Sequence, residues 1–397
     1  MFNHLVQWLV KDKLVKINPG PTEPMNKVLN IAVDARLLAH PNNGMGRYCE
    51  NIVREFAAQQ SPHRIFLYSD RPFQLRFPLP EHWKVRTGRV SSRGLSTIFA
   101  QALFPVWALK DGIDVFWSPS PILPAFLPPR IRKVITVHDM VWKRFPQTMT
   151  RLTLFFEKVF MPLSLRISDR VMADSQFTRS EVLKFFPGAK DKIDVVYLAS
   201  SLQNNGATGP SPISSPYFLF VGSSEPRKNL ERMLLAYVQY RKASPYPSNL
   251  VIAGSYQWGD FSVIDFIRTN DLETCVHLIR HVDDGVLSAL YAHAQALVLV
   301  SLYEGFGLPL VEAMQWGIPM IASNNSSVAE IAGDAALLVD PNDTDAIAAA
   351  FNRMTEDQSL RLELARKAGV RGREFSWKRA AAETMALLGG NPTLAKV

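Results

Sequence analysis

Short apolar runs recur along most of the chain and alternate with longer amphipathic stretches. Most of these runs are almost continuously hydrophobic, which is typical of parallel strands covered by helices on both faces. Amphipathic stretches such as Arg47–Ala57 and Glu231–Arg241 separate many of them and indicate repeated strand–helix–strand units. The predicted strands are Leu29–Val33, Ile65–Tyr68, Lys84–Thr87, Val115–Trp117, Val134–Val137, Arg170–Ala173 and Asp194–Tyr197 in the first half, and Tyr217–Val221, Leu250–Ala253, Val276–Leu278, Ala296–Val300, Met320–Ala322 and Ala336–Val339 in the second.

A polar segment separates the two series of strands. Ser200–Pro216 is rich in Ser, Gly, Asn and Pro and contains one leucine and one isoleucine, too few large apolar side chains for a core. This composition predicts an interdomain linker. We therefore expect an α/β protein with two doubly wound, Rossmann-like domains, residues 28–199 and 217–374. A cleft between them would face the carboxyl ends of the strands, where such sheets bind ligands.

The first 27 residues form an extension before the first predicted strand. Its start carries no positive charge, and it has neither a continuous apolar core nor a small-residue cleavage site, so it does not resemble a secretory signal peptide. Its apolar residues have helical spacing, and lysines follow them. The segment therefore predicts either a basic amphipathic helix on a membrane surface or a helix that packs on its own domain. The residues concerned are Phe2, Leu5, Val6, Leu9, Val10, Lys11, Lys13 and Lys16.

The composition is that of a folded, water-soluble chain. Of its 397 residues, 47% are hydrophobic and 20% charged, and no apolar run approaches the roughly 20 residues that a membrane span needs. Two cysteines, Cys49 and Cys275, are too few for a disulfide framework or a cysteine zinc site. We expect a reducing, cytoplasmic environment.

Positive charge is concentrated in the first half. Residues 1–200 contain 28 Lys and Arg against 16 Asp and Glu, whereas residues 201–397 contain 16 against 20. A basic half favours an anionic partner, which is a nucleic acid, an anionic membrane or a phosphate-bearing substrate. No nucleic-acid-binding module or aromatic–basic stripe is present, so we expect no nucleic-acid partner.

The strongest local motif is the segment Glu304–Glu312, EGFGLPLVE, directly after a predicted buried strand. Pro309 suits the first turn of a helix, and Gly305 and Gly307 allow a ligand to approach the backbone closely. A helix that begins here presents free amides and a positive dipole end to an anion. The two glutamates would then contact different parts of one polar ligand. The alternative is a buried turn with the second glutamate in solvent.

A second motif, Gly222–Leu230, GSSEPRKNL, also follows a buried strand. Arg227 offers a planar fork of donors and Lys228 a compact charge, and together they suit a diphosphate. The alternative is ordinary surface charge. However, basic residues near a helix start are unfavourable, which favours a ligand.

Three further candidates lie in the first half. Gly44 and Gly46 belong to a turn that opens the first helix and is consistent with either phosphate contact or an ordinary turn. His138 and Asp139 end a strand where clefts form, so that His138 would relay a proton or serve as a structural histidine. Ser175 also ends a strand and would contact substrate or cap the next helix. The GxGxxG fingerprint is absent, which disfavours a dehydrogenase.

Taken in order, these segments resemble glycosyltransferase family 4, nucleotide-sugar-dependent enzymes with the two-domain GT-B fold. The resemblance covers nearly the whole chain after about residue 28. The sequence departs from the family in its N-terminal extension and in Met45, where the family frequently has a small β-branched residue. The matching segments are Val33–Arg36, Gly44–Tyr48, Val137–Asp139, Ala173–Ser180, Val221–Leu230, Glu304–Ala313, Gly317–Pro319, Glu330–Gly333 and Phe375–Trp377.

The resemblance implies a role for each matching residue of the second half. Glu304 would bind the donor sugar hydroxyls, and Glu312 would bind the ribose. Arg227 and Lys228 would neutralise the departing diphosphate. The remaining contacts to the donor would come from Gly222, Val282, Gly305, Phe306, Gly307 and Leu308, with Val282 near the base and the Leu308 amide on the diphosphate.

The first half would supply the opposite wall of the cleft. Gly44 and Gly46 would line it, His138 would face the donor sugar with Asp139 beside it, and Ser175 would contribute to the substrate site. The last segment, residues 375–397, would form a helix that crosses back to the first domain.

The function that the resemblance implies is retaining transfer of a hexosyl group from a GDP- or UDP-linked sugar, with no cofactor and no required metal. Similarity to bacterial polysaccharide mannosyltransferases favours a mannosyl group, and a glycan or lipid-linked glycan acceptor in cell-surface polysaccharide or lipopolysaccharide synthesis. The enzyme would be cytoplasmic or peripheral on the inner face of the membrane. The alternatives are a soluble transferase that makes a small disaccharide or glycoside, and a catalytically silent nucleotide-sugar-binding protein.

Overall fold

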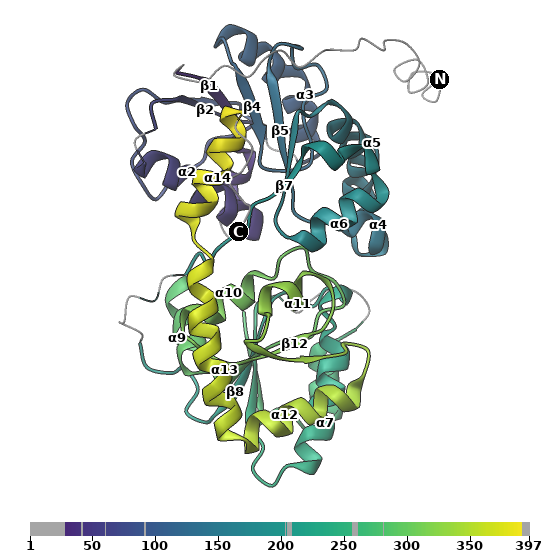
Figure 1. The fold of residues 1–397 in the computed structure, drawn as a ribbon. Coiled ribbons are helices and arrows are strands. Elements are labelled where there is room, and N and C mark those ends of the chain that lie inside the picture. The colour runs from purple at the N-terminus through teal and green to yellow at the C-terminus, as the bar shows by residue number, and fades with distance from the viewer. Residues whose placement is uncertain are drawn as a thin grey trace.

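The computed structural model describes residues 28–40, 43–59, 61–90, 93–202, 204, 209–255, 261–280 and 282–390. Within these residues the chain forms two α/β domains, one above the other in Figure 1. The strands of the N-terminal domain are β1 (Asn30–Asp34), β2 (Arg64–Ser69), β3 (Lys84–Thr87), β4 (Val115–Ser118), β5 (Arg132–Val137), β6 (Arg170–Ala173) and β7 (Ile193–Val195). Those of the C-terminal domain are β8 (Tyr217–Val221), β9 (Asn249–Ala253), β10 (Val276–Ile279), β11 (Ala296–Leu299), β12 (Met320–Ser323) and β13 (Ala336–Val339).

Helices connect most of the strands. The N-terminal domain has α2 (Gly44–Ala58), α3 (Arg93–Lys110), α4 (Val141–Arg144), α5 (Arg151–Ile167) and α6 (Gln176–Phe185). The C-terminal domain has α7 (Leu230–Ala243), α8 (Val263–Thr269), α9 (Asp284–His293), α10 (Leu308–Gln315), α11 (Ser326–Ala332), α12 (Thr344–Glu356) and α13 (Gln358–Arg371), and α14 (Trp377–Gly389) ends the described chain. Short 3-10 helices are η1 (Ala35–Ala39), η2 (Pro146–Thr148), η3 (Pro187–Lys192), η4 (Pro226–Lys228) and η5 (Gly372–Glu374).

Both sheets are parallel and doubly wound. The strand order is β3-β2-β1-β4-β5-β6-β7 in the first sheet and β10-β9-β8-β11-β12-β13 in the second. The direction of winding therefore reverses between β1 and β4, and again between β8 and β11. Ligands of such sheets bind at the carboxyl ends of the strands on either side of this switch point.

Apolar packing covers both faces of each sheet, as the continuous hydrophobic strands predict. In β1, the side chains of Ile31 and Val33 join the core beneath α2, whereas Ala32 joins the core on the opposite face with Phe104 of α3 and Leu165 of α5. This double coverage identifies the N-terminal sheet as the centre of a three-layer domain.

The chain passes between the domains twice, at the predicted linker and just before α14, and these two segments are in contact. The helix α14 packs against α2 of the N-terminal domain, so the described chain ends on the domain that holds its first strand (Figure 1). Its first residue, Trp377, donates from the indole N–H to the carbonyl oxygen of Ser200, 2.8 Å away. Leu202 in the predicted linker is buried in the same core.

The predicted strands are confirmed, with ends that differ by at most two residues. The first helix begins at Gly44 rather than Arg47, because the Asn43 side chain accepts from the Gly46 amide and caps the helix at the glycine turn. The predicted amphipathic segment 1–27 and parts of the predicted linker lie outside the described residues. No helix in the described part of the chain has the length and apolarity to cross a membrane.

Candidate active site

The two glycine-containing motifs of the C-terminal domain lie at its switch point. One follows β8 and the other follows β11, and these strands are neighbours in the sheet. The topology therefore brings Arg227 and Lys228 next to Glu304, although Lys228 and Glu304 are 76 residues apart in the sequence.

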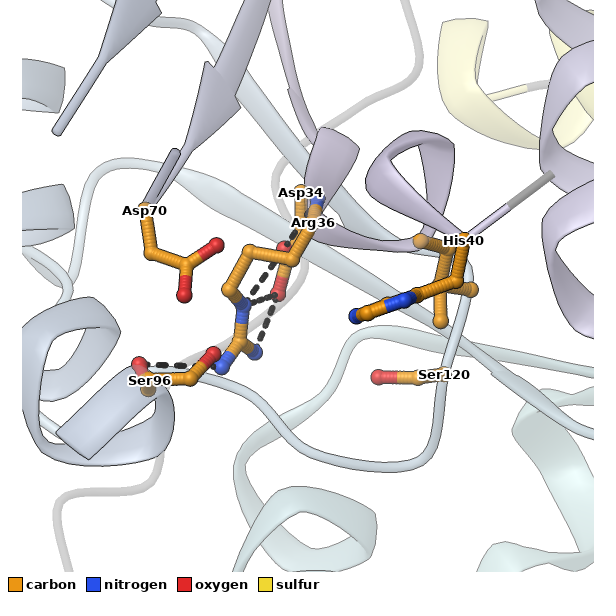
Figure 2. A pocket seen from close by; sticks show the side chains of 7 residues that line it. Asp34, Arg36, His40, Asp70, Ser96 and Ser120 are labelled. Atoms are coloured by element: carbon orange, nitrogen blue, oxygen red, sulfur yellow. Dashed lines mark hydrogen bonds and ion pairs between the residues drawn. The ribbon is translucent and has the colours of Figure 1, made fainter. Parts of the chain in front are cut away.

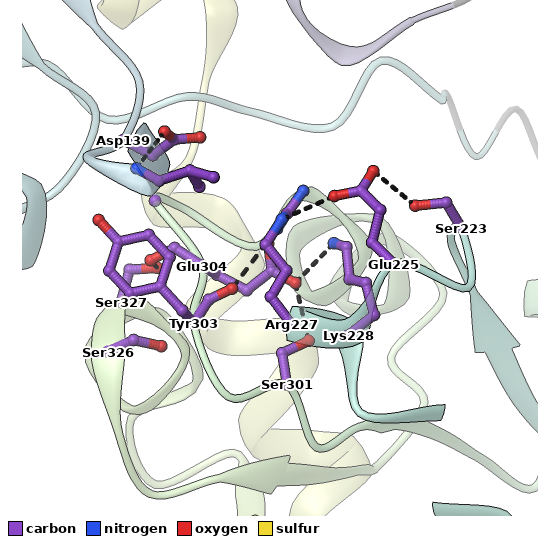
Figure 3. Close-up of polar contacts among 12 residues, drawn as sticks. Asp139, Ser223, Glu225, Arg227, Lys228, Ser301, Tyr303, Glu304, Ser326 and Ser327 are labelled. Carbon is purple, nitrogen blue, oxygen red and sulfur yellow. Dashed lines mark hydrogen bonds and ion pairs between the residues drawn. The ribbon is translucent and has the colours of Figure 1, made fainter. Parts of the chain in front are cut away.

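The carboxylate of Glu304 holds both cations at once (Figure 3). Its Oε1 lies 2.5 Å from Nζ of Lys228, and its Oε2 lies 3.0 Å from a terminal nitrogen of Arg227. Ser301 also donates to Oε1, at 2.8 Å. Burial alone would raise the pKa of Glu304, but Lys228 and Arg227 lower it below its usual value. The glutamate is therefore ionised. Arg227 also pairs with Glu225, whose Oε2 lies 2.8 Å from its Nε, so two carboxylates balance the two cations (Figure 3).

Local backbone geometry fixes the position of the cations. Asn229, which follows them, has a left-handed backbone with φ of 60° and is buried. Its side-chain amide donates to the carbonyl oxygens of Val300 and Pro341, at 2.9 and 2.7 Å. The Leu302 amide donates to the Arg227 carbonyl oxygen, at 2.7 Å. These bonds attach the η4 turn to the loop that carries the glutamate.

The N-terminal domain is hydrogen-bonded to the loop that contains Gly305 and Gly307. The hydroxyls of Ser175 and Thr178 both donate to the Gly305 carbonyl oxygen, at 2.7 and 2.9 Å. A Cβ atom on Gly305 would lie 1.8 Å from the carbonyl oxygen of His138, so only glycine allows this approach. Ser175 also caps α6 through the Thr178 amide. Ser175 thus both caps a helix of its own domain and bonds to Gly305 of the other, and contact of Ser175 and Gly305 with substrate remains a prediction.

The helix α10 begins at Leu308, as predicted. Gly307, with φ of 98°, is the N-cap residue of this helix, and Pro309 lies in its first turn. Phe306 is buried in the core. Gly44 of the N-terminal domain faces this helix start, since a Cβ atom on Gly44 would lie 3.4 Å from Leu308. Pro309 has no N–H, and the Leu310 amide donates to the Gly307 carbonyl oxygen at 2.9 Å, which leaves the Leu308 amide as the N–H that a ligand would meet at this end of α10.

Glu312 is buried on α10 rather than solvated. Its Oε2 accepts from the hydroxyl of Tyr291, at 2.8 Å, and the Tyr291 ring stacks on Trp316. Burial raises the pKa of Glu312, while the Tyr291 hydroxyl and the more distant Arg47 oppose that shift. Tyr291 was not among the predicted site residues, because an isolated tyrosine in an apolar helix is indistinguishable from a core residue.

His138 is held at both ring nitrogens. Nδ1 lies 2.6 Å from Asp174, and Nε2 lies 3.0 Å from the carbonyl oxygen of Pro119. A carbonyl oxygen only accepts, so Nε2 carries a proton. Burial lowers the pKa of His138, but Asp174 outweighs it and raises the pKa to about 9. Asp139, the predicted neighbour, instead accepts from the Val141 amide at 2.9 Å.

An ion pair crosses between the domains near the predicted base site. Arg47 in the first turn of α2 lies 2.6 Å from Asp284 at the start of α9. Val282, two residues earlier, is partly buried beside the core. Gly46 is buried against the His40 carbonyl oxygen, so it shapes the turn rather than the surface of the cleft. Gly222 follows β8, and a Cβ atom on it would lie 3.9 Å from the Lys228 side chain.

A polar cavity of about 190 Å³ lies at the switch point of the N-terminal sheet (Figure 2). Asp34 ends β1, Asp70 follows β2, and Ser120 follows β4. Arg36 pairs with Asp34 at 2.6 Å and donates to the carbonyl oxygen of Ser96. The cavity thus offers carboxylates, a guanidinium and hydroxyls, which are groups that bind sugar hydroxyls. The sequence indicates the matching segment Val33–Arg36 but not this cavity.

A further contact between the domains was also missed. Both carboxylate oxygens of Glu330 on α11 accept backbone amides at the start of α6, from Gln176 at 2.8 Å and Phe177 at 2.9 Å. The hydroxyl of Tyr197 donates to the same carboxylate. Among the described residues, no group of three or more His, Cys, Asp or Glu side chains is placed to hold a metal ion.

Family comparisons agree with this geometry. Residues 42–201 match the model of Glycosyltransferase Family 4, and residues 207–374 match that of Glycosyl transferases group 1. The chain is also 29% identical over 371 residues to O-antigen chain mannosyltransferase B of Escherichia coli, covering 88% of this chain and 96% of the relative. The chain belongs to the family 4 glycosyltransferases. The predicted family and enzyme class, a hexosyltransferase, are confirmed.

Solved structures show that this glycosyltransferase has the GT-B fold, as predicted. Sucrose-phosphate synthase from Thermosynechococcus elongatus superposes with a TM-score of 0.69 at 19% identity, covering 90% of this chain and 98% of that one. HepE of Anabaena, in complex with UDP and glucose, gives a TM-score of 0.68 at 17% identity, covering 92% and 100%.

Proposed function

We propose that this glycosyltransferase moves a mannosyl group from a nucleotide-diphosphate sugar to a glycan acceptor in cell-surface polysaccharide synthesis. One observation supports the donor class above all others. The cations Arg227 and Lys228 lie beside the loop that leads into the amide end of α10, so two cationic side chains and the Leu308 amide converge at one place. This combination suits a diphosphate. The mannosyl group follows from the E. coli relative.

The chemical step that fits these groups is front-face substitution with retention. The C1–O bond to the diphosphate breaks, the acceptor hydroxyl oxygen bonds to C1 on the same face, and a departing phosphate oxygen takes the hydroxyl proton. Negative charge grows on the diphosphate as the bond breaks, and Arg227 and Lys228 stabilise it. Lys228 has three N–H donors and uses one on Glu304, so donors remain for phosphate oxygens.

Other residues would position the donor and acceptor. Glu312 would accept the ribose hydroxyls beside Tyr291. The Nε2–H of His138, which donates to Pro119 in the structure, would exchange that partner for a donor sugar hydroxyl. The polar cavity at Asp34, Arg36 and Asp70 would receive the acceptor sugar.

The proposal includes no metal and no other cofactor, since the two cations provide the charge that a divalent ion supplies elsewhere. Turnover that persists in excess EDTA is the expected result. Turnover that is lost in EDTA and restored by Mg²⁺ or Mn²⁺ would contradict this part.

A thermal-shift panel of GDP, UDP, ADP and their sugars tests the donor, because a bound nucleotide stabilises the fold. We expect stabilisation by GDP or UDP and their sugars, followed by transfer of the sugar to a lipid-linked glycan. Efficient transfer to a free monosaccharide alone would favour the soluble disaccharide or glycoside synthase. Donor binding without turnover on any acceptor would favour the silent nucleotide-sugar binder.

A further inference from the structure

One side of α3 is apolar and exposed to solvent. Leu95, Ile98, Val106 and Leu109 have the spacing of one helix face, and their exposed fractions are 54%, 57%, 44% and 53%. The opposite side packs on the sheet through Phe104, which is fully buried. The helix therefore has two apolar sides, of which only one is covered in the described structure.

The helix α5 repeats this arrangement. Leu152, Phe155 and Val159 recur at intervals of three and four residues and are 51%, 50% and 40% exposed. Met161 and Leu165 on the other side are buried in the same core that α3 covers. Isolated exposed leucines are common, but two such stripes on neighbouring helices are a feature of interaction surfaces.

A loop joins the two stripes into one surface. Phe126, 74% exposed, belongs to the segment between β4 and β5. The Gln101 side chain of α3 bonds to the backbone of Leu123 and Ala125, at 2.9 and 2.7 Å, and the Leu123 amide donates to Ser164 of α5, at 2.8 Å. Figure 1 shows α3 and α5 on the same flank of the N-terminal domain. We call this the α3–α5 surface; it comprises Leu95, Ile98, Val106, Leu109, Phe126, Leu152, Phe155 and Val159.

The segments that form this surface are strongly basic. Residues 93–110, 121–131 and 151–167 together contain six Lys or Arg and a single acidic residue, Glu157. Positive charge beside an apolar stripe is the pattern of segments that bind anionic lipid, where the cations meet the headgroups and the apolar side chains enter the interface. Two copies of the surface would instead bring like charges together with almost no acidic partners.

We propose that the α3–α5 surface docks this glycosyltransferase on an anionic lipid bilayer. Its place beside the cleft gives the docking a purpose. The segment between β4 and β5 carries both Phe126 of this surface and Ser120, which lines the polar cavity at the switch point, and Ser96 of α3 lines the same cavity. A docked enzyme would hold the cleft next to the membrane, within reach of a glycan whose lipid stays in the bilayer. This last step rests on the proposed function, whereas the docking itself does not.

Flotation of the full chain with lipid vesicles tests the docking. We expect binding to vesicles of phosphatidylcholine mixed with phosphatidylglycerol, and much weaker binding to phosphatidylcholine alone. Ile98→Asp on α3 and Phe155→Asp on α5 should each weaken binding about tenfold, because an apolar contact becomes a repelled charge. Leu362→Asp, at a 64% exposed position of α13 in the other domain, is the matched control and should bind like the wild type.

Activity separates docking from catalysis. With a water-soluble glycan acceptor, Ile98→Asp and Phe155→Asp should turn over like the wild type, and with a lipid-linked acceptor in vesicles they should be slower. If no acceptor is used by any form, the proposed function fails while the flotation result still stands. Equal vesicle binding by the wild type and both variants would overturn the docking. The docking would also be overturned if Leu9→Asp in the N-terminal extension, and neither of these variants, abolished vesicle binding. A third contrary result is a wild-type dimer that binds no vesicles and that both variants dissociate.

Discussion

The ammonium of Lys228 lies 2.5 Å from a carboxylate oxygen of Glu304, and both side chains are largely buried. Without this carboxylate, Lys228 and Arg227 would place two like charges side by side away from water, with only Glu225 beside Arg227 to balance them, at a considerable cost in free energy. The glutamate therefore lets the cations be positioned before any substrate binds. A diphosphate that enters the site meets donors that are already ordered.

Replacing either cation should reduce the rate of the chemical step. We expect Arg227→Ala and Lys228→Ala each to lower kcat by about 10²- to 10³-fold, with a smaller effect on KM for the acceptor, because the lost interaction grows with charge on the leaving group. Steady-state kinetics with donor and acceptor varied separately measures this. Lys242→Ala, at an exposed position of α7, is the control. Wild-type kcat in both variants would refute a role in departure of the diphosphate.

The ion pair of His138 and Asp174 should make stability depend on pH. The pKa of His138 is raised to about 9, so the pair stabilises the fold fully below the ordinary histidine pKa and loses this contribution as the pH rises through about 9. Asp174→Asn removes the partner and should lower the free energy of unfolding near neutral pH by about 3 kcal/mol. It should also shift the histidine titration to lower pH.

Denaturant unfolding at several pH values, together with NMR titration of the His138 ring, measures both effects. Asp265→Asn, an exposed carboxylate on α8, serves as the control. A His138 pKa that stays near 9 in Asp174→Asn would show that another group holds the proton.

Tyr291 should position Glu312 for the nucleotide. In Tyr291→Phe the carboxylate loses the hydroxyl that opposes the effect of burial, so the pKa of Glu312 should rise. Nucleotide affinity should then fall about tenfold. The loss should deepen as the pH falls, because less of the carboxylate is ionised.

Calorimetric titration of the nucleoside diphosphate at two pH values measures this effect. Tyr240→Phe is a matched control, since Tyr240 is buried in the same domain but bonds to Ser248 and Thr355. If Tyr291→Phe lowers only the melting temperature and leaves the pH dependence of affinity unchanged, Tyr291 has a structural role.

Glu330 should hold the two domains together. Its carboxylate bonds to the first amides of α6, so Glu330→Ala removes a cap and a bond between domains at once. We expect a loss of about 1 kcal/mol in stability and a larger radius of gyration by small-angle X-ray scattering. Glu363→Ala on α13, whose carboxylate pairs with Lys367 at the surface, should change neither appreciably. An unchanged radius in Glu330→Ala would mean that other contacts suffice for closure.

The sequence carried enough information for the strands and for most of the cleft, because these depend on local pattern. The apolar runs and the glycine–proline turns mark where each strand ends and where α10 begins. The contact of His138 with Asp174 requires the topology as well. Val137 is the register partner of Ala173 in adjacent parallel strands, so the next residues emerge side by side. The sequence indicates both residues but not their pairing.

Contacts between the domains could not be predicted. Glu330 and Gln176 lie 154 residues apart, and nothing in the helical pattern around either distinguishes a carboxylate that caps a distant helix from one in solvent. The same holds for Arg47 and Asp284, whose pairing depends on how the two domains face each other. The exposure of the outer side of α3 could not be predicted either, because a helix with apolar residues on all sides has the pattern of a fully buried helix.

The grip of Ser175 and Thr178 on the Gly305 carbonyl has a consequence for exchanging halves between related enzymes. The loop that leads to the donor site takes part of its shape from hydroxyls on the opposite half. Consider a hybrid that joins this C-terminal half to the N-terminal half of another enzyme. It needs both hydroxyls at the matching positions to keep the sugar-nucleotide specificity of the C-terminal half.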